Sequence, residues 1–379
     1  MKIYHQFTQE TIAFCFMGRV HNWRMKTHGN HSVGILADDL TSAADGASPF
    51  VMRGLTAWIG RAELPGHKAA VISVDSGSRS MSAEQAARRT GDLAAQLSSH
   101  HILYKTVDST LRGHLSVELE AAFHASGRKR LVFAPAFPAA GRTTVGGVQY
   151  VNGVGVSESV YGRDPVHPAR TSLLADLVPL SISDVVMLDA MTQEDLDQQI
   201  AALTEPESIL WVGSPGMAQA LARTLATGVT QAGMVSASCS TVLVAIGSAN
   251  PISHLQADRV EETAGVTLLR APCDRASNAQ DVLTRTAQAA ASRIQSGAVD
   301  LLVATGGDTM EAILDRLNVR TFLLFDELEP GFPLGRTVLA DGRTLLIAMK
   351  AGGFGDEDTL RRAISRLRHD PLLSKQVLS

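Results

Sequence analysis

Three polar loops in the first half of the chain combine acidic, basic and hydroxyl side chains. Each loop follows a short apolar run, and together they contain Asp38-Asp39, Asp75 to Arg79, and Lys105 to Gly113. Arginine and lysine bind carboxylates, whereas aspartate and serine form hydrogen bonds with hydroxyl groups. This mixture predicts a site for a small polyhydroxylated anion.

A structural role is the alternative for each of these residues. An isolated aspartate after a strand commonly caps a helix or forms a turn, and an isolated loop cation is commonly solvated. The adjacent pair Asp38-Asp39 is harder to explain in this way, because only one of the two can cap a helix and the other adds like-charge repulsion. Three such loops in one half of the chain therefore favour a binding site.

The last third of the chain has a different pattern, in which glycines follow predicted strands. The segments are Gly247-Ser248, Thr305 to Thr309, and Lys350 to Gly355. A glycine lets backbone N–H groups approach phosphate oxygens without a Cβ in the way. None of the segments has the Gly-Lys-Ser/Thr ending of a Walker A loop or a GxGxxG fingerprint, and each alone could be a plain turn. The three together favour phosphate binding.

The elements that must position these loops are short apolar strands that alternate with helices. The predicted strands are 33–37, 70–74, 102–104, 131–134, 185–188, 209–212, 242–246, 301–304, 321–325 and 345–348. Continuous apolar strands alternating with helices are typical of parallel sheets covered on both faces. In such sheets, ligands lie at the carboxyl ends of the strands. The sequence therefore predicts an α/β fold with two α/β domains and mainly parallel sheets.

Local sequence patterns predict where some helices begin and where the alternation of strands and helices is interrupted. Thr41 or Ser42 is expected to cap a helix over 43–52, and Ser82-Ala83-Glu84-Gln85 predicts a capping box. Residues 136–180 are rich in Gly, Pro, Thr and Val, which predicts a long functional loop or a small β-insertion.

The composition excludes several classes of protein. The chain has 379 residues, 45% hydrophobic and 19% charged, with a formal net charge of −4. This charge does not suit a dedicated nucleic-acid binder, and no apolar run approaches the roughly 20 residues that span a bilayer. The three cysteines form no CxxC pair, so the sequence predicts neither a disulfide framework nor a structural zinc site and favours a cytoplasmic location.

Five motifs, in order between about residues 32 and 370, resemble those of the four-carbon acid sugar kinases. They are Gly34 to Thr41 (GILADDLT), Lys105 to Gly113 with its Asp-Ser-Thr-Leu-Arg-Gly core, Ala134 to Thr143, Gly306 to Thr309, and Lys350 to Gly355. That family phosphorylates the 4-hydroxyl of D-threonate, D-erythronate or 3-oxo-tetronates with ATP.

The mixed composition of 1–31 predicts a weakly ordered extension, and the Gly-, Ser- and Thr-rich stretch 226–240 predicts a domain boundary. The resemblance implies that 32–235 is a four-carbon acid sugar-binding domain and that 236–379 is a nucleotide-binding domain. Substrate and nucleotide would bind in the cleft between the two domains.

Site residues follow from the resemblance, motif by motif. Asp39 and Asp108 are the candidate general bases. The expected sugar-acid contacts are Asp38, Asp39, Arg79, Lys105, Thr106, Val107, Asp108 and Ser109. The expected nucleotide contacts are Ser248, Gly306, Gly307, Asp308, Thr309 and Gly352.

The cofactors implied are ATP and Mg²⁺, and no protein ligand is assigned to the metal because Mg²⁺ commonly keeps several waters beside the substrate phosphates. The implied partners are the sugar acid and ATP, with no nucleic acid and no membrane, and a homodimer is left open.

Three positions depart from the family pattern, and several functions stay open. Ser42 stands where the family often has Gly, Asp308 replaces the usual Glu, and Ala351 replaces a common Ser. The form of the third loop favours D-threonate or D-erythronate over a 3-oxo-tetronate. A non-catalytic sensor of nucleotide or sugar acid and a nucleotide-dependent oxidoreductase are the alternatives from other classes, although the missing GxGxxG motif argues against the latter.

Overall fold

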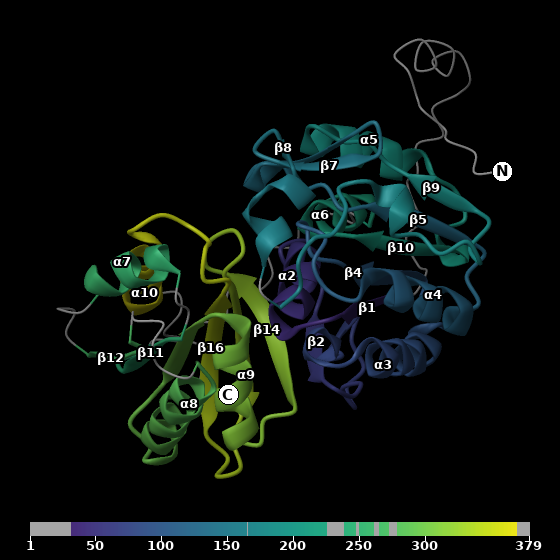
Figure 1. The fold of residues 1–379 in the computed structure, drawn as a ribbon. Coiled ribbons are helices and arrows are strands. Elements are labelled where there is room, and N and C mark those ends of the chain that lie inside the picture. Colours follow the sequence, from purple (N-terminus) through teal and green to yellow (C-terminus); the bar gives the residue numbers. More distant parts are fainter. Residues whose placement is uncertain are drawn as a thin grey trace. The chain divides into compact units, whose positions relative to one another are not determined.

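The computed structural model describes residues 32–369 except 165, 226–238, 248–249, 261–264 and 273–278. Its described residues form two compact units (Figure 1). Unit 1 contains residues 32–38 and 70–225, and unit 2 contains residues 39–69 and 239–369. The predictions for residues 1–31, for Ser248 and for the boundary at 235/236 lie outside the described residues.

Unit 1 is built around a parallel sheet of six strands. In spatial order they are β3 (Val71–Asp75), β1 (Val33–Ala37), β4 (Ile102–Thr106), β10 (Ile209–Gly213), β5 (Arg130–Ala134) and β9 (Val185–Met187). Every residue of β1, β3, β4 and β10 is buried, as expected for a sheet covered on both faces.

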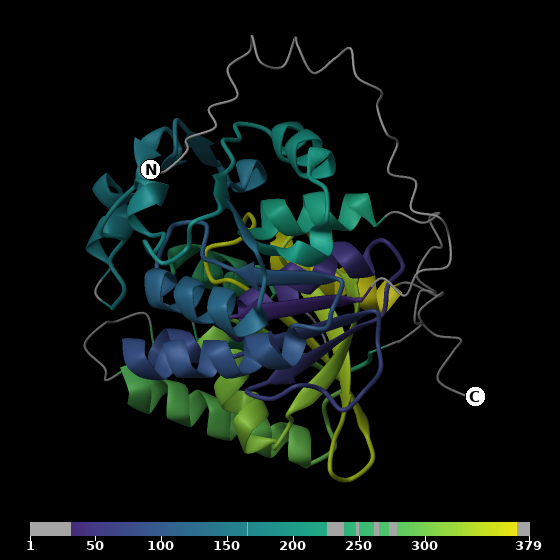
Figure 2. The same ribbon diagram turned by 90° about the vertical axis from the view of Figure 1, so that its right-hand side faces the viewer.

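Helices cover this sheet in pairs. The helices α3 (Ala83–Leu97) and α4 (Leu115–Ser126) run side by side, as Figure 2 shows, and α5 (Gln193–Ala202) and α6 (Pro215–Thr224) form a second pair. The predicted capping box at the start of α3 is present between Ser82 and Gln85.

A small antiparallel sheet interrupts unit 1 where the sequence predicts an insertion. It consists of β6 (Arg142–Val145), β7 (Val148–Val151) and β8 (Val154–Gly155), followed by short 3₁₀ turns. Glycines at the tight turns adopt positive φ angles, which permits the two-residue hairpin loops.

Unit 2 has a mixed sheet of seven strands. In spatial order they are β12 (Val266–Arg270), β11 (Val242–Ile246), β13 (Leu301–Thr305), β16 (Thr344–Lys350), β15 (Pro333–Val338), β14 (Thr321–Glu327) and β2 (Ala57–Arg61). The first four are parallel, and the last three join by antiparallel pairing.

Five helices flank the sheet of unit 2 in its described residues. They are α2 (Leu40–Val51), α7 (Pro251–Asp258), α8 (Ala279–Gln295), α9 (Gly307–Arg316) and α10 (Thr359–His369). The apolar sides of α7 and α10 share a core with β11, β13 and β16, while α8 and α9 pack against each other. Among the residues described, no helix is both long and apolar enough to cross a membrane.

The segment 39–69 differs from the predicted division of the chain. The sequence places it in the first domain, but α2 and β2 pack with unit 2. The unpredicted strand β2 pairs with β14, and the buried Arg61 of β2 donates to Val319 O at 2.8 Å and to Asp315 Oδ1 at 2.8 Å. These contacts join residues about 260 positions apart, and no local pattern encodes them.

Candidate active site

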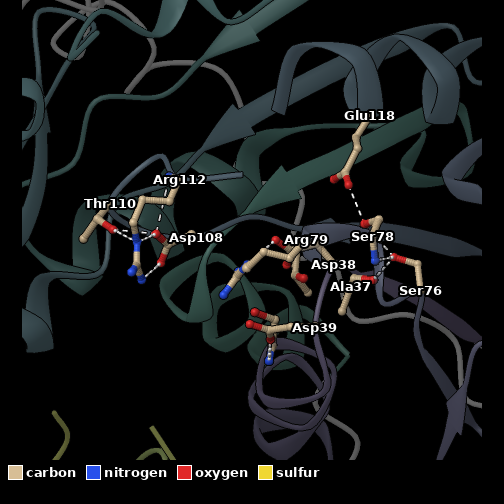
Figure 3. Close-up of polar contacts among 12 residues, drawn as sticks. Ala37, Asp38, Asp39, Ser76, Ser78, Arg79, Asp108, Thr110, Arg112 and Glu118 are labelled. Carbon is tan, nitrogen blue, oxygen red and sulfur yellow. Dashed lines mark hydrogen bonds and ion pairs between the residues drawn. The ribbon is translucent and has the colours of Figure 1, made fainter. Parts of the chain in front are cut away.

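The carboxyl ends of three strands lie side by side in unit 1. Ala37 at the end of β1 is paired with Asp75 of β3, and Leu36 is paired with Lys105 of β4. This register brings together the loops that follow β1, β3 and β4, as the sequence predicts for a parallel sheet. Figure 3 shows the side chains that meet there.

Asp38 and Arg79 form an ion pair in this group. The Arg79 Nε and Nη2 atoms each lie 2.8 Å from Asp38 Oδ2. Burial alone would raise the pKa of the Asp38 carboxyl, but the charges of Arg79 and Lys105 outweigh burial and lower it. Asp38 is therefore an ionised carboxylate that already has a cationic partner.

Lys105 is neutralised by a residue that the sequence analysis does not single out. Its Nζ lies 2.9 Å from Glu118 Oε2, and both side chains are at most 2% exposed. The Ser78 hydroxyl donates to Glu118, and the Ser76 hydroxyl donates to Ser78 at 2.8 Å and lies 2.7 Å from Ala37 O. This buried network ties α4 to the ends of the strands, and we assign Lys105 a positioning role rather than a free charge.

Asp108 belongs to a second charged group in the third loop. Arg112 Nε lies 2.6 Å from Asp108 Oδ2, the Thr110 hydroxyl donates to the same oxygen at 2.5 Å, and Arg112 reaches Asp164 at 3.3 Å. Burial raises the pKa of Asp108, but the charges of Arg112 and Arg79 outweigh it and lower that pKa to about 2. A carboxylate of such low pKa is a weak proton acceptor at neutral pH.

The remaining predicted sugar-acid contacts are mostly buried. Thr106 and Val107 are each 3% exposed, and the Val107 N–H donates to Gly213 O of β10. Ser109 is half-buried, and its carbonyl accepts a hydrogen bond from Gln149 of β7 at 2.8 Å. In the same loop, Leu111 has a φ of +59°, a strained conformation for a branched side chain that is found more often at functional sites than elsewhere.

Asp39 lies in unit 2, although it follows Asp38 directly. Its side chain accepts a hydrogen bond from Ser42 N at 2.6 Å, so Asp39 is the N-cap of α2, and the predicted caps Thr41 and Ser42 lie within the helix. The pair Asp38-Asp39 thus splits between the two units. One carboxylate caps a helix and the other forms an ion pair, which explains how adjacent like charges coexist.

Glu311 of α9 is a second acid near the start of α2. Its Oε1 accepts a hydrogen bond from Leu40 N at 3.3 Å. Burial, followed by the negative charge of Asp39, raises the pKa of Glu311 to about 7. Glu311 is not among the site residues predicted from the sequence.

The raised pKa of Glu311 predicts a pH-dependent stability. The folded-state pKa of about 7 exceeds the ordinary value of 4.5, so the free energy of unfolding falls as the pH rises through this window. Glu311→Gln should therefore stabilise the protein by about 1–3 kcal/mol at pH 8 and have little effect at pH 4.5. Denaturant titrations at both pH values measure this difference. The exposed Glu63→Gln is the control, and equal effects of Glu311→Gln at both pH values would contradict the prediction.

Three strand ends also lie side by side in unit 2. Thr305 at the end of β13 is paired with Ile246 of β11 on one side and with Lys350 of β16 on the other. The glycine-containing segments predicted for phosphate binding therefore meet at one edge of this sheet. The predicted contact Ser248 follows β11 but lies outside the described residues.

Two glycines at this edge are required by the local structure, whether or not a ligand binds there. Gly306 has a φ of +92° and caps the start of α9, which favours glycine whatever its ligand. A Cβ on Gly247 would lie 1.8 Å from Thr309 Oγ1, so the close approach of α9 requires glycine there. Of the other predicted contacts, Asp308 is exposed, Thr309 is buried, and Gly307 and Gly352 are half-buried.

Lys350 is a buried cation at the same edge. Its side chain is 1% exposed, and its Nζ donates to Ala351 O at 2.9 Å and to Gly352 O at 3.4 Å. No carboxylate of the described residues forms an ion pair with it. Burial lowers the pKa of the Lys350 ammonium to about 8. An anionic ligand at this edge would supply the missing negative charge.

The donor set at this edge of unit 2 suits phosphate oxygens. The described residues contain no group of three or more His, Cys, Asp or Glu arranged to hold a metal ion. The start of α9 and the Lys350 ammonium instead offer N–H donors and positive charge, which suit phosphate oxygens.

One missed residue had a signal in the sequence. Glu118 occupies an apolar stripe of α4, at the spacing i, i+3, i+4, i+7 set by Leu115, Leu119 and Ala122. A charged residue on a buried helix face needs a partner. The position of Glu118 on this face therefore indicates that its carboxylate is paired, but it does not indicate which residue is the partner.

Comparisons with known proteins match the chain to two family models, whose bounds differ from those of the two units because 39–69 of unit 2 falls in the first model and 194–225 of unit 1 falls in the second. The family model for a sugar-binding N-terminal domain matches residues 33–182, and the model for a nucleotide-binding C-terminal domain matches residues 194–360. A protein of Bordetella bronchiseptica named D-threonate kinase is 31% identical over 409 residues, covering 90% of this chain and 98% of that protein. The chain belongs to the four-carbon acid sugar kinase family.

Relatives in this family differ in the substrate that their names give. A Methylobacterium radiotolerans protein named 3-oxo-tetronate kinase is 26% identical over 426 residues, covering 89% of this chain and 99% of that protein. A solved structure from Salmonella typhimurium has a TM-score of 0.74 and 19% identity, covering 88% of this chain and 98% of that one, and it supports the fold.

Proposed function

We propose that this protein transfers the γ-phosphoryl group of ATP to the 4-hydroxyl of D-threonate or D-erythronate. The observation that carries the proposal is that the two units have different kinds of side chains at their strand ends. Unit 1 gathers carboxylates, cations and hydroxyls at three strand ends, whereas unit 2 gathers glycines and a lysine that forms no ion pair with a carboxylate of the described residues. The family relationship with a named D-threonate kinase supports the choice of substrate.

Unit 1 would bind the sugar acid. Its ion pairs hold Arg79, Arg112 and Asp108 in fixed positions, and fixed groups of this kind orient hydroxyls and a carboxylate at low entropic cost. The buried network of Lys105, Glu118 and Ser78 keeps the strand ends rigid beneath them.

Unit 2 would bind the nucleotide. The start of α9 and Lys350 would hold the phosphates, and Gly352 would leave room beside them. When bound, Mg²⁺ neutralises charge on the phosphate oxygens, and Asp308, which is exposed at the start of α9, is the carboxylate available to it or to the ribose.

The transfer needs a proton acceptor for the 4-hydroxyl. The hydroxyl oxygen forms a bond to the γ-phosphorus as the bond from that phosphorus to ADP breaks, and the hydroxyl proton passes to a carboxylate. We assign this role to Asp39, because the pKa of Asp108 is lowered to about 2 and Arg112 occupies its oxygens. Asp39 is half-buried, and its side chain accepts the hydrogen bond from Ser42 N at the start of α2.

An assay of ADP release tests the proposal. The purified protein would be mixed with Mg-ATP and a panel containing D-threonate, D-erythronate and 3-oxo-tetronates, and the phosphorylated product would be located by NMR. We expect turnover with D-threonate or D-erythronate and a 4-phosphate product. Turnover restricted to 3-oxo-tetronates would show that the substrate is a 3-oxo-tetronate instead. Binding of sugar acid and ATP without ADP release would indicate a sensor. Light scattering on the same sample would show whether the protein is a homodimer.

A further inference from the structure

The cations of unit 1 differ in whether an internal carboxylate already neutralises them. Arg79 is paired with Asp38, and Lys105 is paired with Glu118. Arg112 is paired with both Asp108 and Asp164. Three cations are therefore matched by four carboxylates, and this part of unit 1 would repel an anion if no other positive charge were present.

Arg142 supplies positive charge beside this group without a carboxylate of its own. Among the described residues no acid forms an ion pair with it, and its hydrogen-bond acceptors are Ala140 O and, at 3.0 Å, the Tyr161 hydroxyl. Its Nε is buried and has no hydrogen-bond acceptor. A guanidinium has five N–H donors, so this one keeps unused capacity for an anion.

Tyr161 contacts both Arg142 and Arg112, and Arg112 is the partner of Asp108. The guanidinium carbon of Arg142 lies 5.9 Å from the centre of the Tyr161 ring, and that of Arg112 lies 5.3 Å from the same ring. Arg112 in turn holds Asp108. Arg142 is therefore connected to the Asp108 loop through the ring of Tyr161, which Arg112 also contacts.

The backbone around Arg142 is fixed before any ligand binds. Arg142 begins β6 and pairs with Val151 of β7, and its N–H and carbonyl both form hydrogen bonds with Phe137. A rigid guanidinium loses little conformational entropy on binding a carboxylate, and its planar fork matches carboxylate geometry.

We infer that Arg142 binds the carboxylate of the four-carbon acid and is the residue that makes the site selective for acids over neutral sugars. The inference rests on the proposed function. It places the carboxylate contact in the β-insertion, because Arg79 and Lys105 among the predicted sugar-acid contacts already have carboxylate partners. Arg79 and Lys105 then act by holding Asp38 and Glu118 in place.

Calorimetric binding of D-threonate and of its neutral amide tests this inference. Arg142→Gln should weaken binding of the acid about 10- to 100-fold and leave binding of the amide unchanged, because the amide lacks the charge that Arg142 recognises. Arg142→Lys should give an intermediate loss, since it keeps the charge but not the fork. Arg163→Gln is the matched control, because Arg163 is exposed in the same 3₁₀ turn as Tyr161, and it should bind the acid within twofold of wild type.

Several outcomes would overturn the inference. Unchanged acid binding in Arg142→Gln, or an equal loss of acid and amide binding, would remove Arg142 from carboxylate recognition. If Arg142→Gln does not fold, as judged by its melting curve, Arg142→Lys decides, and wild-type affinity in that variant would contradict the role of the fork. Wild-type protein that binds no four-carbon acid would overturn the proposed function and this inference with it, whereas wild-type binding that survives in Arg142→Gln overturns the inference alone.

Discussion

Replacing Asp39 by asparagine should lower kcat by about two to four orders of magnitude, the usual contribution of a positioned base. Asparagine caps helices as well as aspartate does, so its side-chain oxygen can still accept the hydrogen bond from Ser42 N. The substitution therefore removes the charge and basicity while preserving the start of α2. Steady-state kinetics with saturating sugar acid and ATP measure the effect.

Two further variants separate catalysis from folding. Asp195→Asn changes a carboxylate in the capping box of α5 and should keep kcat within twofold of wild type. Asp108→Asn should mainly raise the KM for the sugar acid, because Asp108 holds Arg112 in place. If Asp39→Asn kept near wild-type kcat while Asp108→Asn lost it, Asp108 would be the base.

Replacing Lys350 by methionine should weaken ATP binding about 10- to 100-fold without destabilising the protein. The lysine is almost fully buried and has backbone carbonyls as its acceptors. Its buried charge therefore destabilises the free protein, whereas a phosphate beside it would form a strong charge-assisted hydrogen bond. Methionine keeps an unbranched side chain that is one atom shorter and removes the charge. Calorimetry with ATP and denaturant titration at pH 7 measure the two effects.

The pH dependence of stability gives an independent check on Lys350. Its folded-state pKa of about 8 lies below the ordinary value of 10.5, so the unfolded state binds more protons between these pH values and stability rises with pH there. Lys350→Met should lose this contribution. The exposed Lys68→Met should retain it and should bind ATP as wild type does. Wild-type ATP affinity in Lys350→Met would remove this residue from the nucleotide site.

Local patterns in the sequence were sufficient for most strands and for the start of α3. Strands β1 and β11 agree with the predicted bounds, and the capping box of Ser82 and Gln85 is present. Such features depend on residues within one or two turns of each other. The sequence also predicted which polar loops follow the strands. Once the end of a strand is predicted, the residues of the next loop can be read directly from the sequence.

The sequence did not predict strand β2. Strand β2 pairs with β14 and its Arg61 contacts Val319, so its place depends on residues far along the chain. For the same reason the sequence does not indicate that 39–69 packs with unit 2.

The sequence by itself determined which charged residues lie near the strand ends, whereas the tertiary structure decided which of those charges are already neutralised. Lys105 and Glu118 meet because α4 packs beneath the sheet, and Asp38 takes Arg79 as its partner because β1 and β3 are neighbours. Among the described residues, Arg142 has no carboxylate partner, because the β-insertion brings it to Tyr161. Ion pairing falls off over a few ångströms, and distances on that scale between segments far apart in the chain are set by packing, not by spacing in the sequence.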